Sequence, residues 1–224
     1  MGTRKKHRLL DQLEESKITS EEQVAVLRKL AADRAADIRC RAAEQLCIPG
    51  SAEAEVILLQ LLDDKNDMVR VNASDSISAC GSREALEPLK QRTKNDTCFM
   101  VRGYAACSAA EIALRTGAAD DELTAFLMQA LESEKDEWVR ANLFATLYEL
   151  GRDDYLPQLI TALDSNEYQV RCAAVNLLAQ TGKEKDIPLV REALVRRREK
   201  EDSENLAVIS TIDRCLQEMD GGHE

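Results

Sequence analysis

The chain has 224 residues, and its 41 acidic side chains outnumber its 30 basic ones, which gives a formal charge of −11 at neutral pH. This charge disfavours a protein that wraps nucleic acid, because phosphate binding needs a local excess of Lys and Arg. Apolar residues make up 44% of the sequence, whereas aromatic residues make up only 4%. The composition therefore indicates a helical protein with a core and excludes a chain that is disordered throughout.

Two helices are expected at the amino end, over residues 4–16 and 20–32. Ser20 and Gln23 have the spacing of a capping box at the start of the second helix. Together these helices resemble a degenerate first repeat that caps the amino end within residues 1–36.

Five segments then share one pattern, in which an apolar residue precedes an arginine and, in most of them, small residues follow it three and four positions later. The arginines are Arg39, Arg70, Arg102, Arg140 and Arg171, separated by 31, 32, 38 and 31 residues. Further apolar residues stand seven positions after each arginine, at Leu46, Ile77, Ala109, Leu147 and Leu178. These positions lie on one helical stripe, so each segment predicts an amphipathic helix that faces a neighbour.

A glycine follows each of these segments, where a residue in the left-handed conformation is expected to end the helix. The glycines are Gly50, Gly81, Gly117, Gly151 and Gly182. A second run of apolar residues with helical spacing follows each glycine, so each unit is predicted to be helix, turn, helix.

A final helix is predicted over residues 203–218, beginning at Ser203, and it would close the last apolar face. The predicted fold is thus all-α, an α-α superhelix of about five to six helix-turn-helix repeats with terminal capping helices. It forms a single solenoid over residues 1–224, with five repeats in 37–200, the last cap in 201–219 and a tail at 220–224.

The V-R-x-x-A-A-x-x-L core, with its trailing glycine and its period of ~30 residues, resembles the short HEAT repeats named after the phycobilisome lyases. The resemblance covers roughly residues 20–200. It implies that an acidic residue in one turn and the arginine of the next helix form a structural ladder along the array. The implied ladder consists of Arg39, Arg70, Arg102, Arg140, Arg171, Asp33, Asp64, Asp96 and Asp164, with Glu134 at an equivalent place. The acidic residue precedes its arginine by six positions, except that Asp164 precedes Arg171 by seven.

The sequence gives little support for a catalytic function. Histidine occurs only at positions 7 and 223, which disfavours Ser-His-Asp and Cys-His sites. The HEAT-repeat iron hydroxylases use His-Glu pairs within their repeats, and this array has none. We therefore expect no catalytic residue, no metal site and no cofactor, and an enzyme is the less favoured class.

Acidic residues gather near the start of the second helices, which line the concave surface in HEAT folds. They would form an acidic stripe that attracts a basic partner. The helix dipole also favours acidic residues in a first turn, which is the competing explanation. The candidate partner-binding residues are Glu53, Glu55, Glu84, Glu87, Asp121, Glu122, Trp138, Asp153, Asp154 and Tyr155.

The seven cysteines contain no CxxC pair, and no secretory signal or membrane-spanning stretch is present. We expect reduced thiols that pack in the core of a cytoplasmic protein, and no membrane partner. The basic segments at 4–8 and 191–200 are interpreted as solvated surface.

The favoured function is a non-enzymatic scaffold or adaptor that binds a protein or peptide partner on a concave acidic face. No nucleic acid is expected as a partner. One alternative, implied by the resemblance, is a lyase-like or chaperone-like subunit that handles a tetrapyrrole chromophore, with thiols such as Cys98 and Cys107 available. Another is an inhibitor or immunity protein that masks a basic partner.

Overall fold

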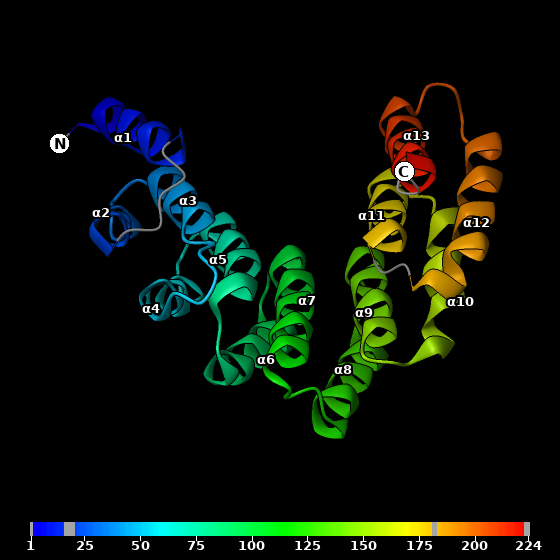
Figure 1. Cartoon of the computed structure of the whole chain (residues 1–224), viewed down its shortest axis with the longest axis horizontal. Coiled ribbons are helices and arrows are strands. Elements are labelled where there is room, and N and C mark those ends of the chain that lie inside the picture. The colour runs from blue at the N-terminus through cyan, green and yellow to red at the C-terminus, as the bar shows by residue number, and fades with distance from the viewer. Residues whose placement is uncertain (1, 16–20, 181–182, 222–224) are drawn as a thin grey trace. The chain divides into compact units, whose positions relative to one another are not determined.

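The computed structural model describes residues 2–15, 21–180 and 183–221, which fold into helices and turns (Figure 1). Ser20 of the predicted capping box and Gly182 lie outside these residues. The chain divides into two compact units, Met1–Leu123 and Thr124–Glu224. From α3 onward, a helix with a repeat arginine, here called an arginine helix, alternates with a second helix, so the predicted all-α repeat is confirmed.

In the first unit, two helices precede the first arginine helix, namely α1 (Thr3–Glu15) and α2 (Glu21–Ala31). The arginine helices are α3 (Ala36–Gln45), α5 (Asp67–Cys80) and α7 (Phe99–Thr116). The second helices are α4 (Ala52–Leu61) and α6 (Leu86–Asn95), the latter preceded by a 3-10 turn, η1 (Arg83–Ala85). Helix α8 (Asp121–Ser133) begins at the end of this unit and continues into the next.

In the second unit, the arginine helices are α9 (Glu137–Glu149) and α11 (Tyr168–Gln180). The remaining helices are α10 (Leu156–Thr161), α12 (Ile187–Lys200) and α13 (Leu206–Gly221). Three 3-10 segments lie beside them, at η2 (Asp153–Tyr155), η3 (Ala162–Asp164) and η4 (Glu184–Asp186).

Helix α13 begins three residues later than predicted. Ser203 lies in a turn, and the first helical hydrogen bonds include that from the Ile209 amide to the Asn205 carbonyl at 3.1 Å. The expected start at Ser203 is therefore wrong, because Asn205 occupies the position that precedes the helix.

The predicted apolar stripe forms the core. All five apolar residues that stand seven positions after a repeat arginine are at most 1% exposed. The residue before each arginine, Ile38, Val69, Val101, Val139 or Val170, is buried as well. Each arginine helix is thus fixed by its apolar face, while its arginine emerges at the edge of the core.

The glycines that follow the arginine helices do not all act alike. Gly50, Gly117 and Gly151 have positive φ angles of 70°, 65° and 92°, as expected for left-handed helix ends. Gly81 has φ −60° and ψ 139°, so the expected left-handed conformation is wrong there. A Cβ atom at Gly81 would lie 2.5 Å from Cδ1 of Ile112, so this glycine permits the close approach of α7.

Within each unit, the arginine helices form the more closely packed row. In the first unit, α3, α5 and α7 pack against one another in succession (Figure 1), whereas α2 and α4 pack less closely. In the second unit, α11 packs against both α9 and α13. The expectation that second helices line a concave surface stays a prediction.

Candidate functional site

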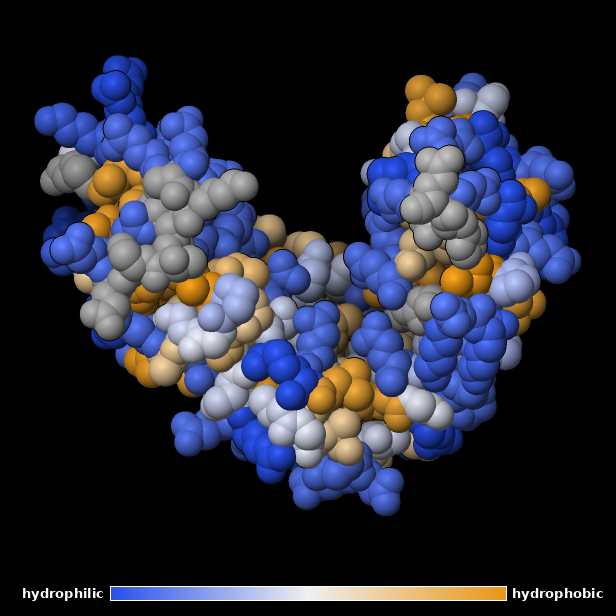
Figure 2. Space-filling view, viewed as in Figure 1, coloured by the Kyte–Doolittle hydropathy of each residue, from blue (hydrophilic) through white to orange (hydrophobic). Residues whose placement is uncertain are grey.

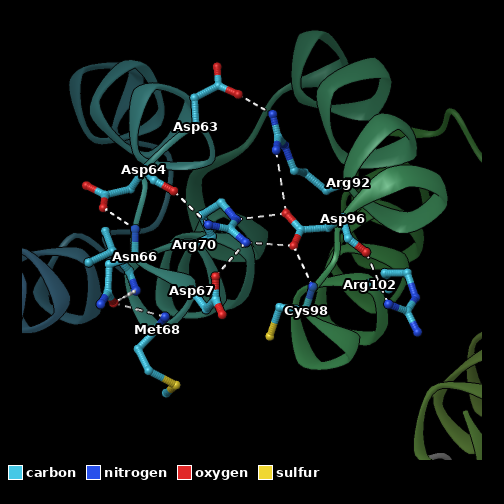
Figure 3. Close-up of polar contacts among 11 residues, drawn as sticks. Asp63, Asp64, Asn66, Asp67, Met68, Arg70, Arg92, Asp96, Cys98 and Arg102 are labelled. Carbon is cyan, nitrogen blue, oxygen red and sulfur yellow. Dashed lines mark hydrogen bonds and ion pairs between the residues drawn. The ribbon is translucent and has the colours of Figure 1, made fainter.

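Arg70 and Asp96 show how consecutive repeats are joined (Figure 3). Arg70 lies on α5, and its Nε and Nη2 donate to the two carboxylate oxygens of Asp96, in the turn before α7, at 2.8 Å each. Its Nη1 donates to the backbone carbonyl of Asp64, in the turn before α5, at 2.8 Å. Both side chains are less than 10% exposed. One arginine thus holds the turn before its own helix and the turn before the next arginine helix.

The same geometry recurs at Arg39. Its Nε and Nη2 donate to the Asp64 carboxylate at 2.6 and 2.7 Å, and its Nη1 donates to the carbonyl of Asp33 at 2.7 Å. Asp33 in turn is paired with Lys6 of α1. Lys6 therefore takes the place of an arginine in the degenerate first repeat, which the sequence pattern did not reveal.

At the carboxyl end, Arg171 of α11 pairs with Glu201, at 2.9 Å from Nε and 2.8 Å from Nη2. Its Nη1 donates to the carbonyl of Ser165 at 2.9 Å. In the first unit, Arg102 of α7 likewise donates from Nη1 to a carbonyl in the turn before its own helix, that of Asp96, at 3.1 Å. Glu201 was missed by the sequence analysis because no repeat arginine follows it.

The paired carboxylates are held in their charged form. Burial raises the pKa of Asp96, but hydrogen bonds from Arg70 and from the Cys98 amide lower it, and the net pKa lies below the usual range. The pKa of Asp64 and of Glu201 is lowered in the same manner, by Arg39 and by Arg171 with Arg197 respectively, against the effect of burial. These groups serve to connect repeats.

A second arginine reinforces two of the pairs. In the first unit, Arg92 contacts both Asp63 and Asp96 (Figure 3). In the second unit, Arg197 contacts Glu201 at 2.8 Å and Asp164 at 3.3 Å. Asp164 is therefore the equivalent of Asp63, and the prediction that Asp164 is a ladder residue is not met.

The ladder is interrupted at Arg140. The residue six positions before Arg171 is Ser165, whose hydroxyl donates to Glu137 at 2.5 Å. Arg140 donates from Nη1 to the carbonyls of Leu131 and Glu134 at 3.0 and 3.2 Å, and it has no carboxylate partner among the described residues.

A groove of about 470 Å³ lies beside this arginine, between α9 and the turn that joins α10 to α11. Its lining includes Arg140, Phe144, Gln158 and Ser165. The Arg140 guanidinium lies over the Phe144 ring, 5.4 Å from the ring centre, and Phe144 is stacked on Tyr155 at 6.1 Å. The groove thus combines an aromatic floor with a cation whose remaining donors are unmatched.

The predicted acidic stripe is only partly available on the surface. Glu55 is buried, and it accepts hydrogen bonds from the amide and the hydroxyl of Ser82 at 2.7 Å each, so its expected exposure to a partner is not met. Glu53 pairs with Arg28 at 3.1 Å. Both residues therefore have partners within the first unit.

Other members of the stripe also have internal partners. Glu87 and Glu122 contact the Lys90 ammonium at 3.1 and 3.2 Å. Glu84 and Asp121 are exposed, and neither has an ion-pair partner in the part of the chain that the structure describes.

In the second unit, Asp153 contacts Lys185 and, at 2.6 Å, Lys183. Hydrogen bonds from these two lysines lower the pKa of Asp153 to about 2. Asp154 contacts Arg152 at 3.2 Å. Much of the stripe's charge is therefore balanced locally.

Large apolar residues are exposed at the first turn of several arginine helices. Met68, Phe99 and Tyr168 are 46%, 40% and 47% exposed. Trp138, a predicted partner-binding residue, occupies the first turn of α9 and is half-buried. Tyr155 instead packs on Phe144. The visible face of each unit is otherwise mostly hydrophilic, with separate hydrophobic patches (Figure 2).

The described residues contain no cluster of three or more His, Cys, Asp or Glu side chains arranged to hold a metal ion.

Burial raises the pKa of the Cys80 thiol to about 11, and it raises the pKa of Cys40, Cys172 and Cys215 as well. In the described part of the chain, no helix has both the length and the apolar character that crossing a bilayer requires.

Comparison with known proteins connects this geometry to a repeat family. The profile described as HEAT repeats matches residues 24–110 and 124–207. None of the curated proteins compared with the chain matches it.

Solved structures offer more distant similarities. Human deoxyhypusine hydroxylase in complex with glycerol is 18% identical, with coverage of 100% of this chain and 92% of that chain and a TM-score of 0.46. An engineered protein is 20% identical, with coverage of 89% and 97% and a TM-score of 0.40. The complex of CpcE and CpcF of phycocyanin lyase from Nostoc provides a chain that is 16% identical, with coverage of 86% and 94% and a TM-score of 0.46.

Proposed function

Because the chain belongs to the HEAT repeat family, as its sequence pattern predicts, we propose that it is a non-catalytic module that binds a protein or peptide partner. HEAT-repeat solenoids are typical of protein-interaction scaffolds. The proposed partner is a segment that carries basic side chains among apolar ones. It would contact the first turns of the arginine helices.

The observation that carries this proposal is the exposure of Met68, Phe99 and Tyr168 in the first turns of three arginine helices, two or three residues before the arginine. The first turn of a helix has no structural need for an exposed Met, Phe or Tyr. Aromatic residues and Met are enriched in the buried centres of protein interfaces. Recurrence in the first turn of three arginine helices favours a shared role in binding.

Acidic residues stand next to these apolar side chains, which indicates the charge of the partner. Asp67 and Glu167 directly precede Met68 and Tyr168, and Glu137 directly precedes Trp138. The helix dipole alone accounts for acidic residues in a first turn. Their adjacency to exposed apolar groups adds a preference for Lys or Arg beside an apolar residue.

The remaining acidic candidates would act at longer range. Residues 124–224 hold 20 acidic and 12 basic side chains, a net of −8, against −3 for residues 1–123. Exposed Glu84, Asp121 and Asp154 would contribute to a potential that speeds association with a basic partner.

The test is selection of random peptides on the immobilised protein, followed by measurement of affinities. We expect enrichment of peptides that combine Lys or Arg with apolar residues. Met68→Ser, Phe99→Ser and Tyr168→Ser should each weaken the selected peptides by about tenfold. Val56→Ser on α4 and Leu189→Ser on α12 are matched controls, because these residues are 46% and 49% exposed but lie on second helices. Selection of peptides that lack Lys and Arg, or equal losses in the control variants, would contradict the proposal.

A further inference from the structure

The two units repeat one arrangement at an offset of 101 residues. Arg39 corresponds to Arg140, and Arg70 corresponds to Arg171. The same offset places Ser165 at the position of Asp64. The chain therefore contains one site twice, once with a carboxylate and once with a hydroxyl.

In the first unit, the donors of Arg39 that correspond to those of Arg140 all have acceptors. Nη1 of Arg39 donates to the backbone carbonyls of Asp33 and Arg34, while Nε and Nη2 donate to the carboxylate of Asp64. A groove of about 460 Å³ accompanies this pair. The groove is thus common to both repeats. In the first unit the Asp64 carboxylate already binds the guanidinium of Arg39, so that guanidinium is not available to a ligand.

At the second place the guanidinium has the same anchor but no carboxylate. Nη1 of Arg140 donates to the carbonyls of Leu131 and Glu134, while Nε and Nη2 find no acceptor among the described residues. The hydroxyl of Ser165 cannot replace the missing carboxylate, because it donates to Glu137 at 2.5 Å and accepts from the Glu167 amide at 3.1 Å.

The neighbouring acidic side chains are engaged elsewhere. Asp164 contacts Arg197 at 3.3 Å, as Asp63 contacts Arg92 in the first unit. Glu137 accepts the hydrogen bond from Ser165. Both carboxylates line the groove beside Arg140, so a ligand whose carboxylate is accompanied by a positive charge is favoured over one that is only negative.

An aromatic residue orients the unmatched donors. Phe144 corresponds to Ala43 in the first unit, and its ring lies 5.4 Å from Cζ of Arg140. Tyr155 is stacked on the Phe144 ring, with the ring centres 6.1 Å apart. A guanidinium held on an aromatic face presents its remaining N–H groups edge-on, which is the geometry that a carboxylate binds with two hydrogen bonds.

We propose that the groove beside Arg140 binds the carboxylate of an Asp or Glu side chain carried by a peptide ligand. The carboxylate takes the place that Asp64 holds beside Arg39. A Lys next to the acidic residue faces Glu137 and Asp164, which line the same groove. This inference does not rest on the proposed function, since it concerns one arginine and not the first turns of the arginine helices.

The test is an NMR titration that follows the Nε–Hε resonance of each arginine. The probes are the blocked peptides Ac-Ala-Lys-Asp-Ala-NH2 and Ac-Ala-Lys-Asn-Ala-NH2, together with inorganic phosphate. We expect a saturable shift of Arg140 with the Asp peptide, about tenfold weaker binding of the Asn peptide, and no shift of Arg39. Ser165→Asp, which supplies the internal carboxylate, should abolish the response of Arg140.

The reciprocal variant gives a gain of function. Asp64→Ser opens the pair at Arg39 and should make the Arg39 resonance respond to the Asp peptide. Arg140→Lys keeps the charge but removes the two-pronged donor, and it should weaken the Asp peptide by about tenfold. Thermal unfolding of each variant confirms that the fold is retained.

Three results would overturn the proposal. One is the absence of a saturable Arg140 shift with the Asp peptide. Another is equal binding of the Asp and Asn peptides. The third is a saturable Arg140 shift with phosphate at the same affinity as with the Asp peptide, which would indicate a general anion site. None of these results bears on the exposed Met68, Phe99 and Tyr168 surface, so the two proposals can fail separately.

Discussion

Arg70 and Asp96 form a two-pronged ion pair that joins α5 to the turn before α7, with each nitrogen 2.8 Å from a carboxylate oxygen. The Asp96 side chain is only 2% exposed. Burying two charges costs desolvation energy, so a buried ion pair need not stabilise the fold more than apolar residues of the same size would. Removal of one partner is costly, however, because the other charge then stays buried without compensation.

Replacement of Asp96 by Ala should therefore lower the free energy of unfolding by about 3–5 kcal/mol, because Arg70 would remain buried without its partner. Urea unfolding monitored by circular dichroism measures the change. Asp63→Ala is the control, since Asp63 is 74% exposed where it contacts Arg92, and it should cost less than about 1 kcal/mol. Equal losses in the two variants would show that burial of the pair has no part in its effect.

Stability should also depend on pH through the paired carboxylates. The pKa of Asp64, Asp96 and Glu201 is lower in the folded protein than the usual values of about 3.9 for Asp and 4.3 for Glu. The contribution of these groups is complete above those values and is lost as the pH falls through the folded-state pKa. We expect urea midpoints that change little between about pH 7 and 5 and fall below about pH 4. In Asp96→Asn the fall should be smaller; an unchanged fall would exclude Asp96 as a source.

Two glycines should respond in opposite ways to Asn. Gly117 has φ 65° and ends α7, so Gly117→Ala should cost about 1 kcal/mol and Gly117→Asn should cost less, because Asn tolerates this conformation. Gly81 has ordinary φ but no space, since an added Cβ would meet Ile112. Gly81→Asn should therefore be more destabilising than Gly81→Ala. Thermal unfolding of the four variants gives the ranking, and the same order at both glycines would refute this distinction.

The thiols should differ in reactivity because they differ in exposure. Cys47 is exposed, whereas Cys80 and Cys215 are buried, and burial raises the pKa of Cys80 to about 11. Only the thiolate is nucleophilic. Iodoacetamide labelling at pH 8 followed by peptide mass spectrometry should modify Cys47 well before Cys80 and Cys215. In urea the difference should disappear, and early labelling of Cys80 in the native protein would contradict the structure.

The repeat was predictable because its residues recur at fixed short spacings along the sequence. The arginine, the apolar residue before it and the apolar residue seven positions later lie on one short helix, so a single sequence suffices to find them. Gly81 was not predictable in this way. Its spacing from Arg70 equals that of Gly50 from Arg39, and only the approach of Ile112 distinguishes the two.

The ladder was predictable where one residue type recurs at one spacing, as at Asp64 and Asp96. Asp164 misled the prediction because it lies one residue away from the ladder position, and a shift of one residue in a turn sends the side chain to another partner. The spacing of seven instead of six was the available signal. Glu201 carried no such signal, because its partner Arg171 lies 30 residues earlier and α13 has no repeat arginine.

The shared anchoring of turns has a consequence for how the protein unfolds. Arg39, Arg70 and Arg171 each hold two successive turns, so fraying of one repeat removes a contact from the next and cooperativity spreads by nearest neighbours. Arg140 holds only the turn before its own helix. At this edge a hydrogen bond from the Ser165 hydroxyl to Glu137 stands in place of the two-pronged ion pair found in the other repeats. We therefore expect the segment from Tyr168 onward to open as a separate cooperative unit, while α9 stays folded, more readily than a repeat joined by an ion pair.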